Sequence, residues 1–329
     1  MRGWRSILGL SVALTLSVSG ANAESAAIAS RVISDFKIGS DETRFGALEF
    51  VGGLELSSPN SLFGAFSSIR FLPGAKDFIG VLDTGHWIRG AMQRDAQGKL
   101  SGLSDLTITS MTDASGQSER VKWNMDAEGL TLRDDTILVS FERRHRIDVY
   151  PLQGFETARP KRSLGYLIPR KELRANGGFE LIAASAPESA LKGGTVIVAE
   201  KSTDAAGNLF AAIIDGPLKG LFSVRRFDSF DVTDGDFLPN GDLLVLERRF
   251  NWATGMALRI RRIKGGDIRP GAVVDGEVLL SADLNYQIDN MEGLDVIPGD
   301  DGSSHIILVS DDNHSILQRN LMLEFRLVE

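Results

Sequence analysis

The chain has 329 residues, of which 43% are hydrophobic and 24% are charged, values ordinary for a soluble globular protein that exclude a disordered or fibrous chain. Aspartate and glutamate total 44 against 36 lysines and arginines, so the formal charge of −8 argues against a nucleic-acid-binding protein. The sequence contains no cysteine, which excludes disulfides, thiolate zinc sites and thiol catalysis.

The first 23 residues have the pattern of a secretory signal peptide. Arg2 and Arg5 form a basic start, residues 7–18 form an apolar run, and an Ala-Asn-Ala stretch at 21–23 supplies the small residues of a cleavage site. The apolar run is shorter than the roughly 20 residues that a transmembrane helix needs. We therefore expect cleavage after Ala23, a periplasmic or secreted location, no membrane span in the mature chain, and one domain over residues 24–329.

The rest of the sequence consists of short strand-forming runs separated by turn residues. The runs TVIV at 195–198 and HIILV at 305–309 are rich in β-branched residues. The stretches LPNGD at 238–242 and PGDDG at 298–302 suit tight hairpin turns. This pattern predicts an all-β protein.

Five segments repeat one design. A small or acidic residue opens a short strand, a turn follows, and a second strand ends in an acidic residue, with further strand-like runs before the next copy. Four strands in a unit of roughly 50–60 residues are typical of a β-propeller blade, which buries both faces by stacking against its neighbours. The copies cover residues 63–87, 124–144, 176–201, 232–250 and 290–315.

We therefore predict a single β-propeller of five or six four-stranded blades. A leftover run at 46–57 is expected to pair with the C-terminal run at 321–328 and so close the ring. The competing architecture is a β-sandwich, which does not require a repeated acidic signature.

The repeat predicts a cluster of carboxylates, because the start of one hairpin strand lies beside the end of the next. If the first strands line a central channel, nine carboxylates gather near one mouth. Such crowding is relieved by raised pKa values, by basic partners or by a bound cation, and Ca²⁺ prefers six to eight oxygen ligands. Strand starts supply Glu128, Glu180, Asp236 and Glu292, with Ser68 in the first copy, and strand ends supply Asp83, Glu142, Glu200, Glu247 and Asp311.

Basic residues directly follow several of these acids, namely Arg143-Arg144, Lys201 and Arg248-Arg249. They could neutralise the acids in structural salt bridges, or hold an anionic substrate, because a guanidinium binds phosphate or carboxylate as a fork. Both interpretations are open at this point. His86 and His314 each follow a strand-end acid by three residues, which makes them candidate substrate-binding residues at the rim.

Two C-terminal stretches carry the most specific motifs. They are DGDFLPNGDLLVLERRF at 234–250 and DNMEGLDVIPG at 289–299, the latter continued by HIILVSDDNHSILQRNLMLEF at 305–325. DAEGLTL at 126–132, ILVSFERRHRIDVY at 137–150 and GGFELIA at 177–183 are further copies, the last of which lacks the glycine that follows Glu128 and Glu292. In these stretches the chain resembles the phytase-like propeller family, described as having esterase-like activity of phytase.

The resemblance implies an exported propeller that hydrolyses an ester or phosphoester of a small, often anionic substrate, assisted by Ca²⁺ at an acidic channel mouth. It implies that Glu247 and Asp311 act as catalytic base or further ligands. Arg144, Lys201 and Arg249 would hold the departing anion. The implied metal ligands are Glu128, Glu180, Asp236 and Glu292.

Two other functions fit the same sequence. One is a non-catalytic periplasmic propeller that binds a ligand or a protein, since a fold alone does not fix function. The other is a lactonase-like hydrolase with a single central Ca²⁺, which needs asparagine beside glutamate, and Asn290 and Asn313 are available. We expect the chain to act as a monomer without nucleic acid.

Overall fold

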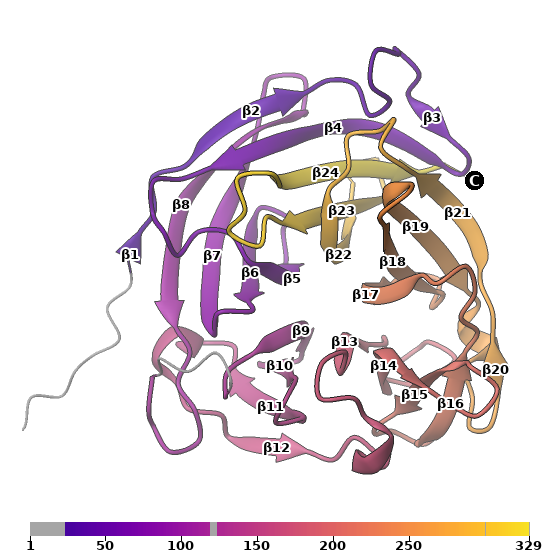
Figure 1. Ribbon diagram of the computed structural model, residues 1–329. Helices are drawn as coiled ribbons and strands as arrows, with labels where there is room; N and C mark the ends of the chain where they lie inside the picture. Colours follow the sequence, from indigo (N-terminus) through magenta and orange to yellow (C-terminus); the bar gives the residue numbers. More distant parts are fainter. Residues whose placement is uncertain (1–23, 119–123, 300, 329) are drawn as a thin grey trace, which may run out of the picture.

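The computed structural model describes residues 24–118, 124–299 and 301–328, so the predicted signal peptide lies outside the described residues. Within these ranges the chain forms five blades of mainly antiparallel strands around a central axis (Figure 1). Helical structure in the described ranges is limited to 3₁₀ turns at Phe155–Thr157, Arg170–Glu172 and Gly265–Asp267. None of the described residues forms a helix that is long and apolar enough to cross a bilayer. The predicted all-β propeller is confirmed, and it has five blades.

Each blade runs from an innermost strand outwards. Blade 1 contains β5 (Phe66–Phe71), β6 (Asp77–Leu82), β7 (His86–Arg94), β8 (Leu100–Ser110) and β1 (Glu24–Ser25). Blade 2 contains β9 (Ala127–Arg133), β10 (Thr136–Phe141), β11 (Arg146–Pro151) and β12 (Arg162–Leu164). Blade 3 contains β13 (Phe179–Ala184), β14 (Thr195–Thr203), β15 (Leu209–Ile213), β16 (Gly220–Val224) and β20 (Val273–Val274).

Blades 4 and 5 complete the ring. Blade 4 contains β17 (Asp231–Phe237), β18 (Leu243–Asn251), β19 (Gly255–Ile263) and β21 (Glu277–Ala282). Blade 5 contains β22 (Asn290–Pro298), β23 (Ser304–Asp311), β24 (Asn320–Leu327), β4 (Leu48–Ser57) and β2 (Ala29–Ile33), with β3 (Arg44–Phe45) beside β4. Strand β4 pairs antiparallel with β24 from Leu56 opposite Asn320 to Leu48 opposite Leu327. The predicted closure of the ring by residues from both ends of the domain is confirmed.

Five apolar clusters hold the blades together, one in each gap between neighbouring blades. Strand β10 shows the principle, because Ile137 and Val139 pack towards blade 1 whereas Leu138 packs towards blade 3. A strand covered on both faces needs apolar side chains at successive positions rather than at alternate ones. This is why the strand-forming runs of the sequence are continuously hydrophobic.

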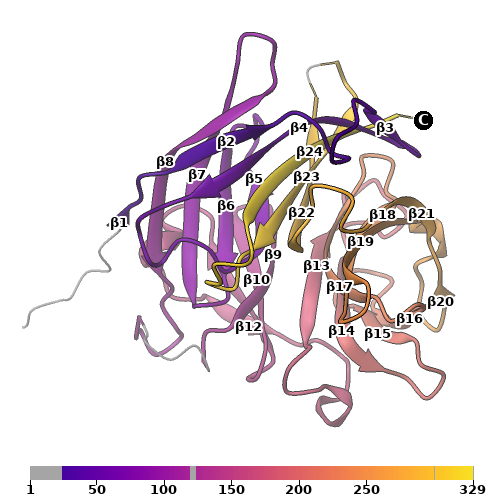
Figure 2. The ribbon, with the colours of Figure 1, turned by 45° about the horizontal axis from the view of Figure 1, so that its top comes forward.

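The two faces of the disc carry different hairpins. The innermost strands all start at one face, which we call the mouth face, and the loop from β23 to β24 lies on it. The hairpins β7–β8 and β22–β23 stand up together on the opposite face (Figure 2).

Candidate functional site

Every innermost strand contains a β-bulge at the same place near the mouth face. The pairing with the second strand skips one residue in each blade, as between Phe66 and Ser68 in β5 and between Met291 and Gly293 in β22. A bulge turns the side chain of the extra residue away from the regular alternation of the strand. These extra residues form a first ring around the axis: Ser67, Glu128, Glu180, Thr233 and Glu292.

A second ring comes from the ends of the second strands. Asp83 donates its backbone N–H to the carbonyl oxygen of Ala65, two residues before the bulge of β5, and Glu142 and Glu200 pair in the same way with Asp126 and Gly178. In blades 4 and 5 the strand register pairs Arg248 with Asp231 and Asp311 with Asn290, again two residues before the bulge. The second ring therefore consists of Asp83, Glu142, Glu200, Arg248 and Asp311.

The two rings enclose a cavity of about 220 Å³ on the axis, which we call the acidic cup. Eight carboxylates line it, together with the basic side chains of Arg143, Lys201 and Arg248. The carboxylates belong to Asp83, Asp126, Glu128, Glu142, Glu180, Glu200, Glu292 and Asp311. Asn176 and Asn313 also line the cup.

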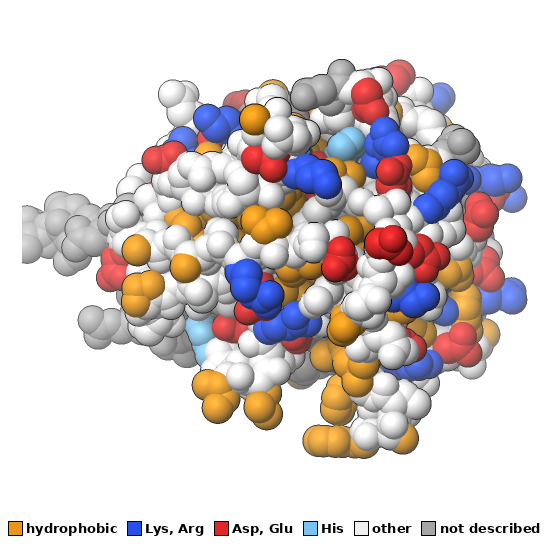
Figure 3. All heavy atoms as spheres, turned by 90° about the horizontal axis from the view of Figure 1, so that it is seen from above, with side chains coloured by type: hydrophobic (Ala, Val, Ile, Leu, Met, Phe, Trp, Pro, Cys, Tyr) orange, Lys and Arg blue, Asp and Glu red, His pale blue; other side chains and the backbone are white. Residues whose placement is uncertain are grey.

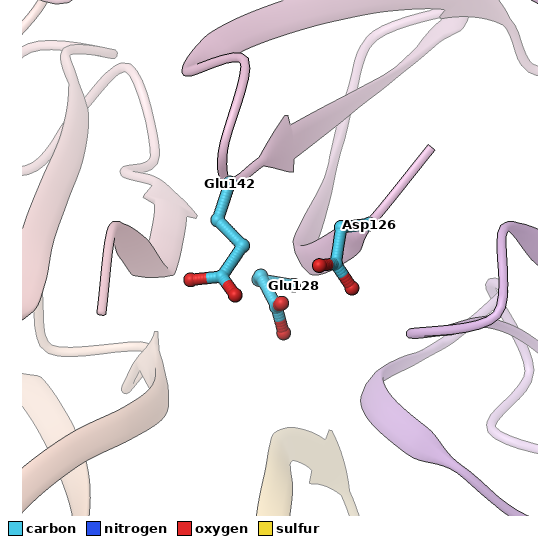
Figure 4. Close-up of side chains that lie close together, drawn as sticks. All are labelled: Asp126, Glu128 and Glu142. Atoms are coloured by element: carbon cyan, nitrogen blue, oxygen red, sulfur yellow. The ribbon is translucent and has the colours of Figure 1, made fainter. Parts of the chain in front are cut away.

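The acids of blade 2 are the most tightly grouped. One carboxylate oxygen from each of Asp126, Glu128 and Glu142 lies within 4.8 Å of the others, and the three side chains converge on one point (Figure 4). Glu142 also accepts a hydrogen bond from the backbone N–H of Gly177 at 2.8 Å, and the Arg143 Nε lies 2.5 Å from an oxygen of Asp126. Hydrogen bonds therefore hold part of this group in place.

The basic residues concentrate on the other side of the cup. Arg248 lies between two acids, with its Nε 3.2 Å from Glu292 and its Nη2 3.5 Å from Glu200. Lys201 Nζ lies 2.5 Å from Glu200. The cup thus has a predominantly acidic side formed by blade 2, where Arg143 pairs with Asp126, and a mixed side formed by blades 3 to 5.

The pKa values of the ring acids are raised mainly because these side chains are buried. Burial, reinforced by the neighbouring carboxylates, raises the pKa of Glu128 and of Glu180 well above the usual range. Burial also raises the pKa of Glu292 to about 8, although Arg248 opposes the shift, and raises the pKa of Asp311 to about 7. Without a cation, several of these groups hold protons near neutral pH.

These residues fit a hard divalent cation. The lining of the cup is almost entirely polar, its candidate ligands are carboxylate and amide oxygens, and the described residues contain no thiolate or clustered histidine ligand near it. Ca²⁺ takes such oxygen ligands, and its positive charge stabilises the ionised form of carboxylates that burial otherwise keeps protonated.

Arg70 crosses the axis beneath the cup. Arg70 lies on β5 and is buried. Its guanidinium donates hydrogen bonds to both carboxylate oxygens of Asp234 on β17, each at 2.9 Å. It also donates to the carbonyl oxygens of Leu294 on β22 and Gly235 on β17, at 2.7 and 2.8 Å. Strand β17 is not a neighbour of β5 in the ring, so the guanidinium spans the channel. The cup is therefore a closed depression rather than the end of an open pore.

The comparisons with known proteins agree with this geometry. The phytase-like family, described as esterase-like activity of phytase, matches residues 61–314. The chain belongs to this family. The match covers all five bulges, so both rings of the phytase-like propeller lie within it. No curated protein sequence matches the chain.

Two solved structures resemble the phytase-like propeller in outline only. The PQQ-bound aldose sugar dehydrogenase of Streptomyces coelicolor is 12% identical, with a TM-score of 0.44 over 87% of this chain and 99% of that one. The endo-arabinase of Bacteroides thetaiotaomicron is 10% identical, with a TM-score of 0.46 over 79% of this chain and 93% of that one. Likenesses this distant carry no argument about activity.

Five of the eleven predicted site residues line the cup. Glu128, Glu180 and Glu292 come from the bulges, whereas Asp311 and Lys201 lie near the ends of the second strands β23 and β14. Of the nine carboxylates expected at one mouth, seven are brought together there, and the exceptions are Asp236 and Glu247.

Asp236 and Glu247 lie elsewhere because blade 4 departs from the repeat. Asp236 is three residues beyond its bulge and accepts a hydrogen bond from the backbone of Val296 at 3.3 Å. Glu247 pairs with Val232 and is buried against Arg259 and Arg261, whose Nε atoms lie 2.6 and 3.0 Å from it. The residues of blade 4 that are equivalent to the ring acids are Thr233 and Arg248.

The remaining four predicted residues do not line the cup either. Arg144 is exposed and donates to Asn124, whereas Arg249 lies over the ring of Phe230. His86 contacts Thr84 at 3.0 Å, and His314 lines an outer depression beside β24. Successive residues of β18 point to opposite faces, so Arg248 rather than Arg249 reaches the cup. In the turn after β10, Arg143 rather than Arg144 lines the cup.

Sequence reasoning missed Asp126 and Asn176 as lining residues, and from the two arginine pairs it selected Arg144 and Arg249 where the structure places Arg143 and Arg248. Asp126 had a signal, because it stands two residues before the bulge glutamate, as Asn290 does in blade 5, where its side-chain amide donates to Glu292 at 2.7 Å. An acid or amide at that spacing marks a strand start whose side chain faces the cup.

Proposed function

We propose that the acidic cup binds a divalent cation, Ca²⁺ by its oxygen ligands, and that the cation-loaded cup hydrolyses an ester or phosphoester bond of a small substrate. The convergence of Asp126, Glu128 and Glu142 on one point carries this proposal. Glu180 and Glu292 are the other carboxylates of the first ring that line the cup. A divalent cation supplies polarisation of an ester or phosphoryl oxygen and an activated water.

The other side of the cup is suited to the substrate. Arg248 and Lys201 are the cations in reach of an anionic group, and each is already oriented by Glu200. Asp311 lines the same cavity and is the candidate general base. Glu247 is not part of this proposal, because its oxygens face two arginines inside blade 4.

Electrostatics make the activity on phosphoesters dependent on the cation. Eight carboxylates against three basic side chains repel a phosphate group until bound cations reduce the charge. A neutral carboxylic ester or lactone meets no such barrier. Removal of the cation should therefore weaken binding of a phosphomonoester more than binding of a neutral ester.

A second candidate is a binding propeller that uses the cation structurally. The volume of the cup favours it, because about 220 Å³ is below the roughly 300 Å³ of the smallest ordinary ligand pockets. Such a cup holds ions and small headgroups. The lactonase-like alternative belongs to the same test, since Asn313 lines the cup and Asn290 bonds to Glu292.

The experiment uses residues 24–329 purified in EDTA. Ca²⁺ and Mg²⁺ are titrated while melting temperature and heat of binding are followed, and phosphomonoesters, carboxylic esters and lactones are then supplied with and without cation. We expect Ca²⁺ to raise the melting temperature and to be required for phosphomonoester turnover. Glu128→Gln should lose both effects, and Glu277→Gln, an exposed glutamate of blade 4, is the matched control.

The outcomes separate the candidates. Stabilisation by Ca²⁺ without turnover of any ester class would favour the binding propeller. No response of melting temperature or heat to either cation would remove the metal-assisted mechanism altogether. We also propose that the chain is exported as a monomer after cleavage at Ala23, and N-terminal sequencing and light scattering of the protein from its host check this.

A further inference from the structure

Two apolar tips project from the mouth face beside the cup, one from blade 4 and one from the neighbouring blade 5. The first is the β18–β19 hairpin, where Phe250 is half exposed and Trp252 is 95% exposed. The second is the β23–β24 loop, where Ile316 is fully exposed and Leu317 is 88% exposed. Figure 3 shows hydrophobic side chains at the ends of two separate projections along its lower edge, the side of the mouth face.

Local hydrogen bonds hold these side chains outward. In the first tip the backbone of Ala253 donates to the side chain of Asn251 at 2.8 Å, and the rings of Phe250 and Trp252 pack edge to face at 5.1 Å. In the second, the backbone of Leu317 donates to the hydroxyl of Ser315 at 3.2 Å. The exposure of these residues is thus a feature of ordered turns.

The tips contain no aspartate, glutamate, lysine or arginine. Residues 250–256 read FNWATGM and residues 313–318 read NHSILQ, in a chain of which 24% is charged. Arg249 precedes the first tip and Arg319 follows the second. An uncharged apolar end can leave water without desolvating a charge, because both flanking guanidinium groups bond within the protein, Arg249 to the carbonyl oxygen of Asp228 and Arg319 to Asp289.

We propose that the two tips insert into the interface of a lipid bilayer and dock the propeller with its acidic cup facing the headgroups. The shape of the tips favours a bilayer over a protein groove, because they are convex, belong to different blades and project to the same side. Tryptophan prefers the boundary between apolar chains and water, where its N–H remains hydrated. The proposal does not depend on the cation or the hydrolase activity proposed for the cup.

Charge sets the expected lipid preference. The formal charge of −8 and the carboxylates of the cup oppose an anionic surface. In EDTA, binding to phosphatidylcholine vesicles should therefore exceed binding to vesicles that contain phosphatidylglycerol. Ca²⁺ should make binding to phosphatidylglycerol vesicles the stronger of the two only if the cup also binds the cation. The measurement with Ca²⁺ is therefore the one part of the test that rests on the proposed function.

The test measures partitioning of residues 24–329 into phosphatidylcholine vesicles in EDTA, by co-sedimentation and by tryptophan emission. Trp87 is buried, so Trp252 is the exposed reporter among the described tryptophans, and its emission should shift to the blue. Replacing Ile316 and Leu317 by serine, or Trp252 by serine, should weaken partitioning about tenfold or more, because each change removes a buried apolar side chain.

The matched control is Val32→Ser with Ile38→Ser, which removes two exposed aliphatic side chains outside the tips and should bind vesicles like the wild type. Equal partitioning of the tip variants and the wild type would overturn the proposal. The absence of vesicle binding at millimolar lipid would also overturn the proposal. This outcome includes the cases in which the tips join two copies of the chain or bind a soluble protein.

Discussion

Replacing Glu292 by glutamine should make the cation-free protein more stable at high pH. The pKa of Glu292 in the folded protein is about 8, whereas its ordinary value is 4.5, because the side chain is buried among other carboxylates. Between these values the folded state holds a proton that the unfolded state releases. The resulting stability is fully present below pH 4.5 and is lost as the pH rises through 8. Glutamine has the shape of the protonated acid and does not titrate.

The size of the effect follows from this pKa difference at about 1.36 kcal/mol per pKa unit. The proton on Glu292 contributes about 4 kcal/mol at pH 5, about 1.4 kcal/mol at pH 7 and close to zero at pH 9. Relative to the wild type, Glu292→Gln should therefore gain up to about 4 kcal/mol in free energy of unfolding between pH 5 and pH 9. Burial lowers the pKa values of His86 and His145, so these histidines reduce the stability of the folded protein at low pH. Both proteins contain them, so their effect cancels when the variant is compared with the wild type.

The assay is urea unfolding of both proteins in EDTA at pH 5, 7 and 9. The same series with Ca²⁺ should show a smaller difference, because a cation bound among the carboxylates replaces the proton as the neutralising charge. If the difference in stability between the variant and the wild type is the same at all three pH values, Glu292 does not have a raised pKa in the folded protein.

Three further predictions concern groups outside the first ring. Arg70→Met should cost about 3–5 kcal/mol in urea unfolding, because it leaves Asp234 buried and unpaired, and a loss below about 1 kcal/mol would contradict this. Glu247→Gln should lower stability by about 2–4 kcal/mol, because two arginines of β19 lose their charged partner. The rise in melting temperature that Ca²⁺ causes should stay the same, and a change in that rise would show that Glu247 contributes to the acidic cup. Gly129→Ala would place a methyl group 2.2 Å from the carbonyl oxygen of Glu180. Thermal unfolding should therefore show a loss of about 1–3 kcal/mol in stability, and calorimetry should show weaker Ca²⁺ binding. An unchanged Ca²⁺ affinity would argue against a rigid ring.

The sequence was sufficient for the architecture and for much of the cup. Each blade has to bury two faces, so its central strand is apolar throughout, and that pattern recurs in every copy together with a turn and an acid. Pairing of the strand at Leu48–Ser57 with the C-terminal strand could be foreseen because one run of residues was left over at each end. Local patterns repeated at fixed intervals carry this information without any knowledge of distances.

Which side chains meet in the cup was decided by register, and the register is a property of the folded sheet. A bulge adds one residue to each innermost strand, and in blade 4 the repeat slips so that Arg248 rather than Glu247 reaches the second ring. A change of one residue turns a side chain to the opposite face of a strand, so neighbouring positions such as Arg248 and Arg249 on β18 have different surroundings although the sequence does not distinguish them. The sequence by itself therefore determined that acids gather at one mouth, whereas only the tertiary structure decided which acids converge, because convergence depends on strand pairings between residues far apart in the chain.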